Sequence, residues 1–186
     1  MRRAVLLGLV FLVVSAGCTA VPFGTDTHQQ PESRNATVLD VVDGDTIDVE
    51  LADGSQDTVR LLGIDTPEVH ADITSGEFEG VPDTEAGQAC LRAVGTNASA
   101  VVTERLPGSE IRLEFDPVSD RRGGYDRLLA YVYHNETNLN YWLVERGYAR
   151  VYDTEFTKAD TFYAAESAAQ AANRGVWNCS TLSEGA

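Results

Sequence analysis

The sequence is poor in basic residues, and lysine is almost absent. Lys158 is the only lysine among 186 residues, and 14 lysines and arginines face 29 aspartates and glutamates, which gives a formal net charge of -15. Proteins that bind nucleic acid mainly through electrostatics carry a basic stripe, and nothing in this balance resembles one. An acid-rich, lysine-poor composition is typical of proteins from salt-loving organisms, so we expect a halophilic protein.

The chain also lacks an apolar run long enough to cross a membrane near its N-terminus. The run at residues 4–14 has eleven residues, whereas a helix needs about 20 to span a bilayer. It follows Arg2 and Arg3, so residues 1–17 are predicted to be an export signal peptide. The small residues directly before Cys18 resemble a lipoprotein signal, in which this cysteine is lipidated, and the twin arginines resemble a twin-arginine export signal.

The remaining sequence divides into a tether, one domain and a short tail. Residues 18–36 are polar, with scattered Pro, Gly and Thr and no periodicity, which predicts a lipid-anchored flexible tether. The length allows one domain, which we place at residues 37–180, followed by a disordered C-terminal tail at 181–186. We therefore expect an exported monomer, held on the extracellular face of the cell membrane by its lipid or secreted.

Cysteine and histidine are scarce. With Cys18 assigned to the anchor, Cys90 and Cys179 remain, and two remaining cysteines in an exported protein favour a disulfide. The alternative is two unpaired thiols, because Cys90 lies on the apolar face of a predicted helix, where cysteine often only packs. The three histidines show no metal-ligand spacing and are interpreted as surface residues.

Two short motifs concentrate carboxylates at the ends of predicted strands. Residues 43–46 read Asp-Gly-Asp-Thr, and residues 60–68 read Arg-Leu-Leu-Gly-Ile-Asp-Thr-Pro-Glu. Apolar and polar residues alternate beside both motifs, as in half-buried strands, and Asp-Gly at 53–54 predicts a hairpin that brings the motifs together. Carboxylates held close together need a cation among them. Oxygen ligands without nearby His or Cys suit a hard ion such as calcium.

Either motif alone could be an ordinary turn, but their order along the chain is specific. With the strand-borne Arg60 opening the second motif, they resemble the thermonuclease (staphylococcal nuclease-like) family. The similarity covers roughly residues 37–178 and continues through Arg-Leu-Leu-Ala-Tyr-Val at 127–132, Leu-Asn at 139–140, Gly-Tyr-Ala at 147–149, Ala-Glu at 165–166 and Arg-Gly-Val-Trp at 174–177.

The order of predicted elements fits the fold that this resemblance implies. Strand patterns occur at 37–42, 46–51, 57–62, 111–115 and 128–133, and helix patterns at 85–105, 138–146 and 157–173. The last helix opens with Thr157 and Asp160 at capping-box spacing. Five strands with interleaved helices predict an α+β OB-fold, a five-stranded partly open β-barrel with three helices.

The resemblance implies a calcium site in the two acidic motifs. By analogy with the family, Asp45 and Asp65 ligate Ca2+ through their carboxylates and Thr66 through its backbone carbonyl. Asp43 is expected behind these ligands, where it would tune the site. Two carboxylates and one carbonyl are few protein ligands, so we expect weak binding completed by water.

The resemblance also implies the residues that act on the substrate, which is DNA and/or RNA. Arg60 and Arg127 are expected to clamp the phosphate, since a planar guanidinium donates two hydrogen bonds and stays charged. Glu68 is expected to position or deprotonate the attacking water, and Tyr125 to lie near a terminal phosphate. Arg122 is a rival for the second clamp, but the Leu-Leu-Ala-Tyr that follows Arg127 favours the latter.

Three functional classes stay open on the sequence. The first is a secreted or surface-anchored calcium-dependent nuclease, favoured because the charged catalytic set of the family is complete. The second is a catalytically silent OB-fold module that binds nucleic acid, which predicts the loss of Glu68 or of one arginine. The third is an acidic calcium-binding surface protein, suggested by the net charge of -15.

Overall fold

The computed structural model describes residues 31–182. The predicted signal peptide, the lipidation site at Cys18 and most of the predicted tether lie outside the described residues, as does the C-terminal tail from 183 onward. Within residues 31–182 no helix is both long enough and apolar enough to cross a membrane.

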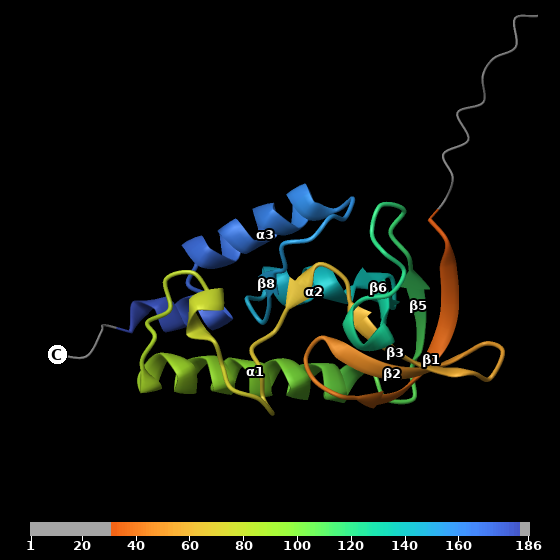
Figure 1. Ribbon diagram of the computed structural model, residues 1–186, viewed down its shortest axis with the longest axis horizontal. Helices are drawn as coiled ribbons and strands as arrows, with labels where there is room; N and C mark the ends of the chain where they lie inside the picture. Colours follow the sequence, from red (N-terminus) through yellow and green to blue (C-terminus); the bar gives the residue numbers. More distant parts are fainter. Residues whose placement is uncertain (1–30, 183–186) are drawn as a thin grey trace, which may run out of the picture.

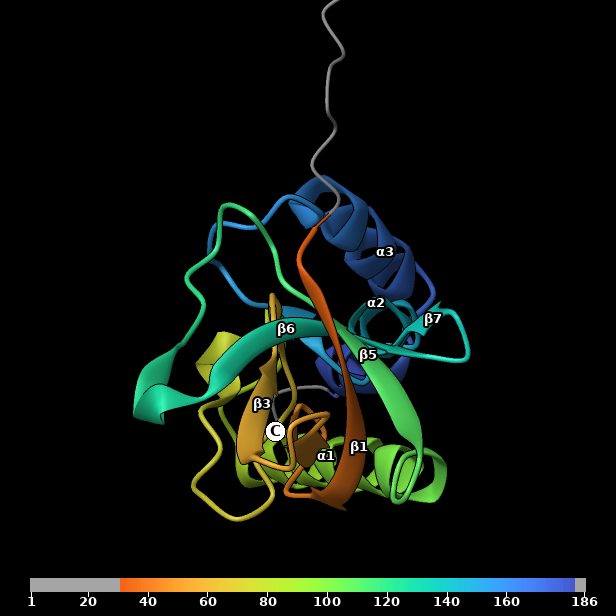
Figure 2. The same ribbon diagram turned by 90° about the vertical axis from the view of Figure 1, so that its right-hand side faces the viewer.

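Five strands form a closed barrel, which confirms the predicted OB-type architecture. They are β1 (Ser33–Val41), β2 (Thr46–Leu51), β3 (Gln56–Leu61), β5 (Glu110–Glu114) and β6 (Leu128–His134). Neighbouring strands follow the order β3-β2-β1-β5-β6 and pair antiparallel, and a parallel pairing of β3 with β6 closes the ring (Figure 2). The barrel is therefore closed by backbone pairing where the sequence predicted it to be partly open.

The first strand begins earlier than the sequence pattern indicated. Residues Ser33 to Thr37 pair with Glu114 to Glu110 of β5, although the prediction placed the strand start at 37. The side chains at the beginning of β1 are exposed, so no apolar periodicity reveals the strand. Its backbone pairs with β5, and this pairing depends on residues far away in the sequence.

Three α-helices are present in the described chain, as predicted, and they lie beside the barrel along the long axis of the molecule (Figure 1). They are α1 (Glu85–Arg105), α2 (Leu139–Glu145) and α3 (Ala159–Ala171). Short 3-10 helices precede α1 (η1, Ser75–Glu77), lie between β5 and β6 (η2, Gly124–Asp126) and follow α3 (η3, Gly175–Thr181). Side chains cap the first two helices: Thr84 accepts from the Gly87 amide and Asn138 from the Tyr141 amide.

The start of α3 differs from its prediction. The capping box at Thr157 and Asp160 is not formed, and the helix begins at Ala159 without a side-chain cap. The amide and hydroxyl of Thr157 donate instead to the Asp116 carboxylate, at 2.8 and 2.5 Å. Because Asp116 is buried, its carboxylate requires these donors, and they draw Thr157 away from the helix.

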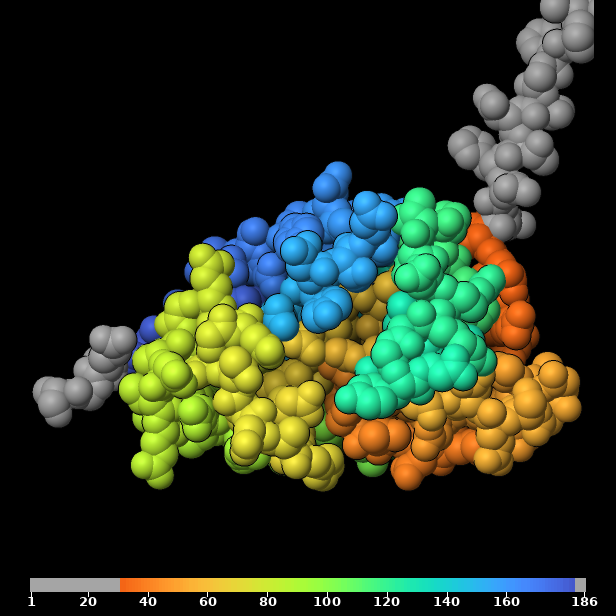
Figure 3. Space-filling view, viewed as in Figure 1, coloured from red at the N-terminus to blue at the C-terminus, as the bar shows by residue number. Residues whose placement is uncertain are grey.

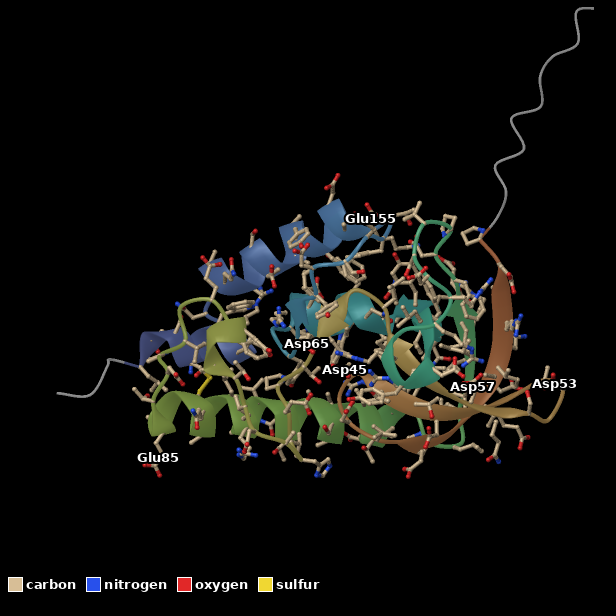
Figure 4. The ribbon with its side chains drawn as sticks, in the orientation of Figure 1. Asp45, Asp53, Asp57, Asp65, Glu85 and Glu155 are labelled. Carbon is tan, nitrogen blue, oxygen red and sulfur yellow. A yellow bond between two sulfur atoms is a disulfide. The ribbon has the colours of Figure 1, made fainter. Side chains whose placement is uncertain are left out.

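Two clusters of buried apolar residues make up the core. The larger one fills the barrel and extends under α2 and α3, and the smaller one lies between α1 and η3. A disulfide joins Cys90 of α1 to Cys179 of η3 beside the smaller cluster, with 5.8 Å between the Cα atoms (Figure 4). The bridge connects elements that are 89 residues apart in the sequence.

A buried asparagine fastens α2 to the closed side of the barrel. Asn140 donates to the carbonyls of Leu62 and Ala130, and its own side-chain oxygen accepts from the Val132 amide. Leu62 directly follows β3 and belongs to the second acidic motif. The contact therefore fixes the backbone from which that motif leaves the barrel.

Candidate active site

The two acidic motifs leave neighbouring strands and meet on one face of the barrel. Asp45 precedes β2, and its carbonyl accepts from the amide of Leu61 at the end of β3. Gly44 permits a close approach of the first motif, because a Cβ at this position would lie 2.9 Å from the Ala98 Cβ and 3.0 Å from the Thr66 side chain. A larger residue at Gly44 would push the two motifs apart.

Asp45 is the buried centre of the site. Its Oδ2 accepts from the Thr66 amide at 2.7 Å and from the Thr66 hydroxyl at 2.9 Å, and the Thr46 hydroxyl donates to its Oδ1 at 3.1 Å. The Asp45 residue is only 4% exposed. These hydrogen bonds satisfy both oxygens of a buried carboxylate.

Arg60 lies between the two predicted metal-binding carboxylates, which Figure 4 labels near the centre of the molecule. Its Nη1 is ion-paired with Asp45, and its Nη2 donates to the Asp65 Oδ1 at 2.8 Å. Burial lowers the pKa of Arg60, but the charges of Asp45 and Asp65 outweigh burial and raise the pKa above its ordinary value. The guanidinium therefore remains charged and bridges both aspartates.

A second arginine at Asp65 was missed by the sequence analysis. The short strands β4 (Ile64–Asp65) and β8 (Arg150–Val151) pair antiparallel, with Arg150 opposite Asp65. The Arg150 Nε donates to the Asp65 Oδ2 at 3.0 Å, and Nη2 lies 2.9 Å from the same oxygen. The sequence offered one signal: Arg150 stands between Ala149 and Val151, flanked by apolar residues as Arg60 is.

Asp43 lies beside the site on the first turn. Its Oδ1 accepts from the Asp45 amide at 3.1 Å, so it contacts the backbone of the neighbouring aspartate. Burial, and then the negative charge of Asp45, raise the pKa of Asp43 to about 6. Two carboxylates near each other in a poorly solvated place are the arrangement that a bound cation would relieve.

The oxygen atoms at this site are of the type that binds a hard cation, although they already accept hydrogen bonds from protein groups. Within residues 31–182 no group of three His, Cys, Asp or Glu side chains is arranged to hold a metal. Both oxygens of Asp45 and of Asp65 already accept from protein donors. A carboxylate oxygen retains a second lone pair, so Asp45, Asp65 and the Thr66 carbonyl could hold calcium if the guanidinium of Arg60 shares these oxygens.

The structure brings the two predicted phosphate clamps to one pocket. Arg60 and Arg127 both line a pocket of about 380 Å³, together with Gly123, Leu129 and Tyr152. Figure 3 shows this face, where the loop before β6 and the segment after β8 flank the recessed chain near residues 60–64. Arg122 lines the same pocket, so a phosphate there would lie within a space that three guanidinium groups border.

The contacts of Arg122 separate it from Arg127. Arg122 donates to both oxygens of Asp57, at 3.1 and 2.6 Å, and lies 3.6 Å from the Asp126 carboxylate. The Arg127 Nε donates only to the Gly124 carbonyl, and no ion pair forms at Arg127 within residues 31–182. Among the described residues, Arg127 therefore has no carboxylate partner, whereas Arg122 has two.

The structure does not place Tyr125 and Glu68 in this pocket. Tyr125 is 96% exposed, has a positive φ of 59°, and its ring lies 5.5 Å from the Arg127 guanidinium carbon. Glu68 is exposed in the loop after β4 and is not among the residues that line the pocket.

Sequence comparisons agree with the fold and the motifs. A family model described as "Staphylococcal nuclease homologue" matches residues 58–179. An uncharacterized protein of Methanocaldococcus jannaschii is 35% identical over 83% of this chain and 75% of its own length. Endonuclease YncB of Bacillus subtilis is 34% identical over 82% of this chain and 65% of its own length. The Thermonuclease of Staphylococcus hyicus is 27% identical over 95% of this chain and 99% of its own length.

These matches confirm the resemblance first drawn from the two acidic motifs and Arg60. The family model covers the second motif, and the closed five-stranded barrel is the fold expected of this family. The chain therefore belongs to the staphylococcal nuclease homologue family and is a phosphodiester hydrolase.

Proposed function

We propose that this nuclease is an exported, calcium-dependent endonuclease that cleaves DNA and/or RNA in the pocket bordered by Arg60 and Arg127. The observation that carries the proposal is the placement of these two arginines. One is held between Asp45 and Asp65, and the other has no carboxylate partner in the described chain. Together they would place two charged guanidinium groups against a scissile phosphate, beside a set of oxygen ligands.

The role of the arginines follows from the charge that develops during hydrolysis. The attack of water on a phosphodiester concentrates negative charge on the equatorial phosphate oxygens. Fixed guanidinium groups stabilise this charge more strongly than water does, because they require little reorganisation. Arg60 is fixed by two carboxylates, and Arg127 by the Gly124 carbonyl, so both are oriented before the substrate arrives.

We propose calcium as the cofactor because the side chains and the carbonyl at this site supply oxygen ligands. Asp45, Asp65 and the Thr66 carbonyl would hold the ion, and Asp43 would lie behind them. When bound, calcium would supply positive charge to the same phosphate oxygens. The oxygen-only ligands and the raised pKa of Asp43 support a cation at this place.

Glu68 is proposed to position or deprotonate the attacking water. It is exposed in the loop that follows β4, three residues after Asp65. Its position outside the described pocket does not argue against this role, because catalytic contacts in ligand-free enzymes are often formed only with substrate. The loop would have to bring Glu68 toward the pocket edge when a substrate binds.

We propose that the protein is exported as a monomer, and its N-terminus and its disulfide support the export. Residues 1–17 have the pattern of a signal peptide, and Cys18 is the proposed lipid attachment site. The Cys90–Cys179 bridge supports this location, because disulfides persist in oxidising compartments. The mature domain would then act on nucleic acid outside the cell, on the cell surface or after release.

A cleavage assay with calcium and with chelator tests the proposal. Wild-type protein should cleave single-stranded DNA or RNA in calcium and lose this activity in excess chelator. Arg60→Gln should lower turnover by at least about 100-fold, whereas Arg34→Gln, which makes the same charge change at an exposed ion pair, should retain turnover. Cleavage that persists after exhaustive chelation would contradict calcium dependence. A folded wild-type protein without cleavage would favour a silent nucleic-acid-binding module.

A further inference from the structure

A second place on the molecule gathers arginines around aromatic rings. A groove of about 670 Å³ lies where the end of α1 meets α2 and the start of η3, and it is lined by Arg105, Arg146 and Arg174 beside Trp142 and Tyr148. We call these five residues the Trp142 groove. Glu145 is the only acidic residue in its lining, so the local charge is positive in a chain with a net charge of -15.

The arginines of the Trp142 groove are largely free of carboxylates. Arg105 donates to the Val101 carbonyl at 2.9 Å, and Arg174 donates to the Glu145 carbonyl at 3.0 Å. Neither forms an ion pair within residues 31–182, and Arg146 has only a long contact of 3.9 Å to Glu145. Carbonyl partners orient a guanidinium without neutralising it, so these three groups retain charge for an anion.

The three arginines of the Trp142 groove differ from most other arginines of the described chain, which are paired closely with carboxylates. Most other arginines of the described chain lie within about 3 Å of a carboxylate; these are Arg34, Arg60, Arg112, Arg121, Arg122 and Arg150. The exceptions outside the Trp142 groove are Arg92 and Arg127, and the latter belongs to the active-site pocket. The acidic surface thus leaves uncompensated arginines in two main places, the active site and the Trp142 groove.

The aromatic rings hold the guanidinium groups in place. The Arg105 guanidinium carbon lies 4.6 Å from the centre of the Trp142 ring, and that of Arg146 lies 5.7 Å from it. Tyr148 stacks on the same indole, with 5.8 Å between centroids and 28° between planes. A guanidinium packed on an aromatic face keeps its in-plane N–H donors available, and it loses less side-chain entropy when it binds a phosphate.

The groove continues past Trp142. A second hollow of about 360 Å³ is lined by Arg105 and Trp142 again, together with His134 and Thr137. The two hollows therefore adjoin each other at Arg105 and Trp142. A ligand longer than one phosphate group could follow both of them.

The Trp142 groove lies away from the active-site pocket. Figure 2 shows α2 and β7 (Thr137–Asn138) on one side of the barrel, and the loop that precedes β6 on the other. Arg127 and Gly124 belong to that loop, and no residue of the Trp142 groove lines the active-site pocket. A short oligonucleotide in the active site would not reach the Trp142 groove, whereas a long one could touch both.

We propose that the Trp142 groove is a second nucleic-acid site, which binds the phosphodiester backbone of single-stranded DNA or RNA outside the active site. This inference rests on the proposed function, since it assumes a polymeric nucleic acid as substrate. Three observations favour this ligand. Several guanidinium groups have no close carboxylate, aromatic rings pack against them, and the two adjoining hollows together are longer than one phosphate group. Such a site offsets the repulsion between the acidic surface and a polyanion, most strongly at low salt.

Binding of long and short oligonucleotides to the intact protein in EDTA tests this proposal. The variant carries Arg105→Gln, Arg146→Gln and Arg174→Gln, which remove charge but retain hydrogen-bonding groups. Its affinity for single-stranded DNA of about 30 nucleotides should fall at least about tenfold, and its salt slope should decrease by about 2, since each lost phosphate contact on a single strand contributes about 0.7. Cleavage of a strand of about 4 nucleotides in calcium should change little, because a strand of this length in the active site does not reach the groove.

A matched control separates the groove from the loss of total charge. Arg34→Gln, Arg112→Gln and Arg121→Gln change the net charge by the same amount, but these arginines are already paired with Glu32 or Glu114. This control should bind long DNA like wild type, and thermal unfolding should show both proteins folded. Equal losses in both variants, or no loss in the groove variant, would overturn the proposal.

Two further outcomes are decisive. If the groove variant lost binding to anionic lipid vesicles but bound the long oligonucleotide like wild type, the groove would be a membrane-surface contact and the proposal would be wrong. If the wild type cleaved neither oligonucleotide in calcium, the proposed function would fail. The affinities measured in EDTA would still decide whether the Trp142 groove binds a strand.

Discussion

Arg150 and Asp65 face each other across the short ladder between β8 and β4, and the guanidinium holds one carboxylate oxygen at 2.9 to 3.0 Å. Arg60 holds the other oxygen of Asp65 at 2.8 Å. A carboxylate fixed from both sides by cations is well positioned but electrostatically satisfied. Any calcium at Asp65 would therefore share the carboxylate with two arginines, so we expect it to bind weakly.

Replacement of Arg150 should alter calcium affinity. Arg150→Gln removes one positive charge that lies against the proposed metal ligand Asp65, so calcium should bind more tightly, by roughly tenfold. Isothermal titration of the variant with calcium measures this directly and does not depend on activity. Arg34→Gln makes the same change of charge at an exposed ion pair and should leave the affinity unchanged. Unchanged or weaker calcium binding in Arg150→Gln would show that Arg150 does not oppose the ion.

Glu68 should be important for turnover but not for stability. It is exposed, and surface substitutions usually change the free energy of unfolding by no more than about 0.5 kcal/mol. Glu68→Gln should nevertheless lower kcat by about 100-fold or more, if its carboxylate positions or deprotonates the water. Glu79→Gln is the matched control, an exposed glutamate of the same loop region. Near-full kcat in Glu68→Gln would remove Glu68 from the catalytic residues.

Replacing Arg127 by glutamine should lower kcat much more than replacing Arg122 by glutamine. Arg127→Gln should lower kcat by about 100-fold, the cost of losing one donor to the developing charge. Arg122→Gln should cost less than about tenfold, because Asp57 and Asp126 already engage this guanidinium at the surface. Steady-state kinetics on one oligonucleotide compares the two variants. The reverse order of effects would assign the second clamp to Arg122.

The disulfide should make a large contribution to stability. The bridge closes a loop with a sequence separation of 89, for which the chain-entropy model gives about 4 to 5 kcal/mol. The double variant Cys90→Ser, Cys179→Ser should therefore unfold at much lower urea concentration, and a reductant should lower the stability of wild type to the same level. A reductant should have no effect on the double variant. A loss below about 1 kcal/mol would show that packing between α1 and η3 suffices without the bridge.

Stability should decrease in acid because of Asp116. Burial raises the pKa of Asp116, but hydrogen bonds from Thr157 and Tyr131 outweigh burial and hold the pKa below its ordinary value. A carboxylate with a lowered folded-state pKa stabilises the fold fully above its unfolded pKa of about 3.9, and this contribution disappears as the pH falls through the folded-state pKa.

Urea unfolding of Asp116→Asn at neutral and acid pH measures this contribution. The variant should be less stable than wild type at neutral pH, and the difference should narrow below about pH 4. Asp120→Asn, an exposed aspartate nearby, should follow the wild-type pH dependence. A difference between Asp116→Asn and wild type that did not change with pH would show that the charge of Asp116 is not the source of the acid sensitivity.

The sequence by itself determined the elements whose signals are local. Apolar alternation located β2 and β3, and helical spacing with Pro-Gly after it located α1 to its last residue, Arg105. The two acidic motifs were sufficient to identify the family, because the order of their residues is specific. These features depend on residues close together in the chain, so they can be recognised without the fold.

Only the tertiary structure decided the features that depend on distant partners. β1 begins at Ser33 because β5 pairs with it, and Thr157 leaves the predicted capping box because the buried Asp116 requires its donors. Arg150 meets Asp65 only because β8 pairs with β4. Likewise, only the fold pairs Arg122 with Asp57, 65 residues away, and leaves Arg127 without a carboxylate partner in the described residues. In each case a contact between residues remote in sequence outweighed the local pattern, since burial and pairing contribute more free energy than propensity does.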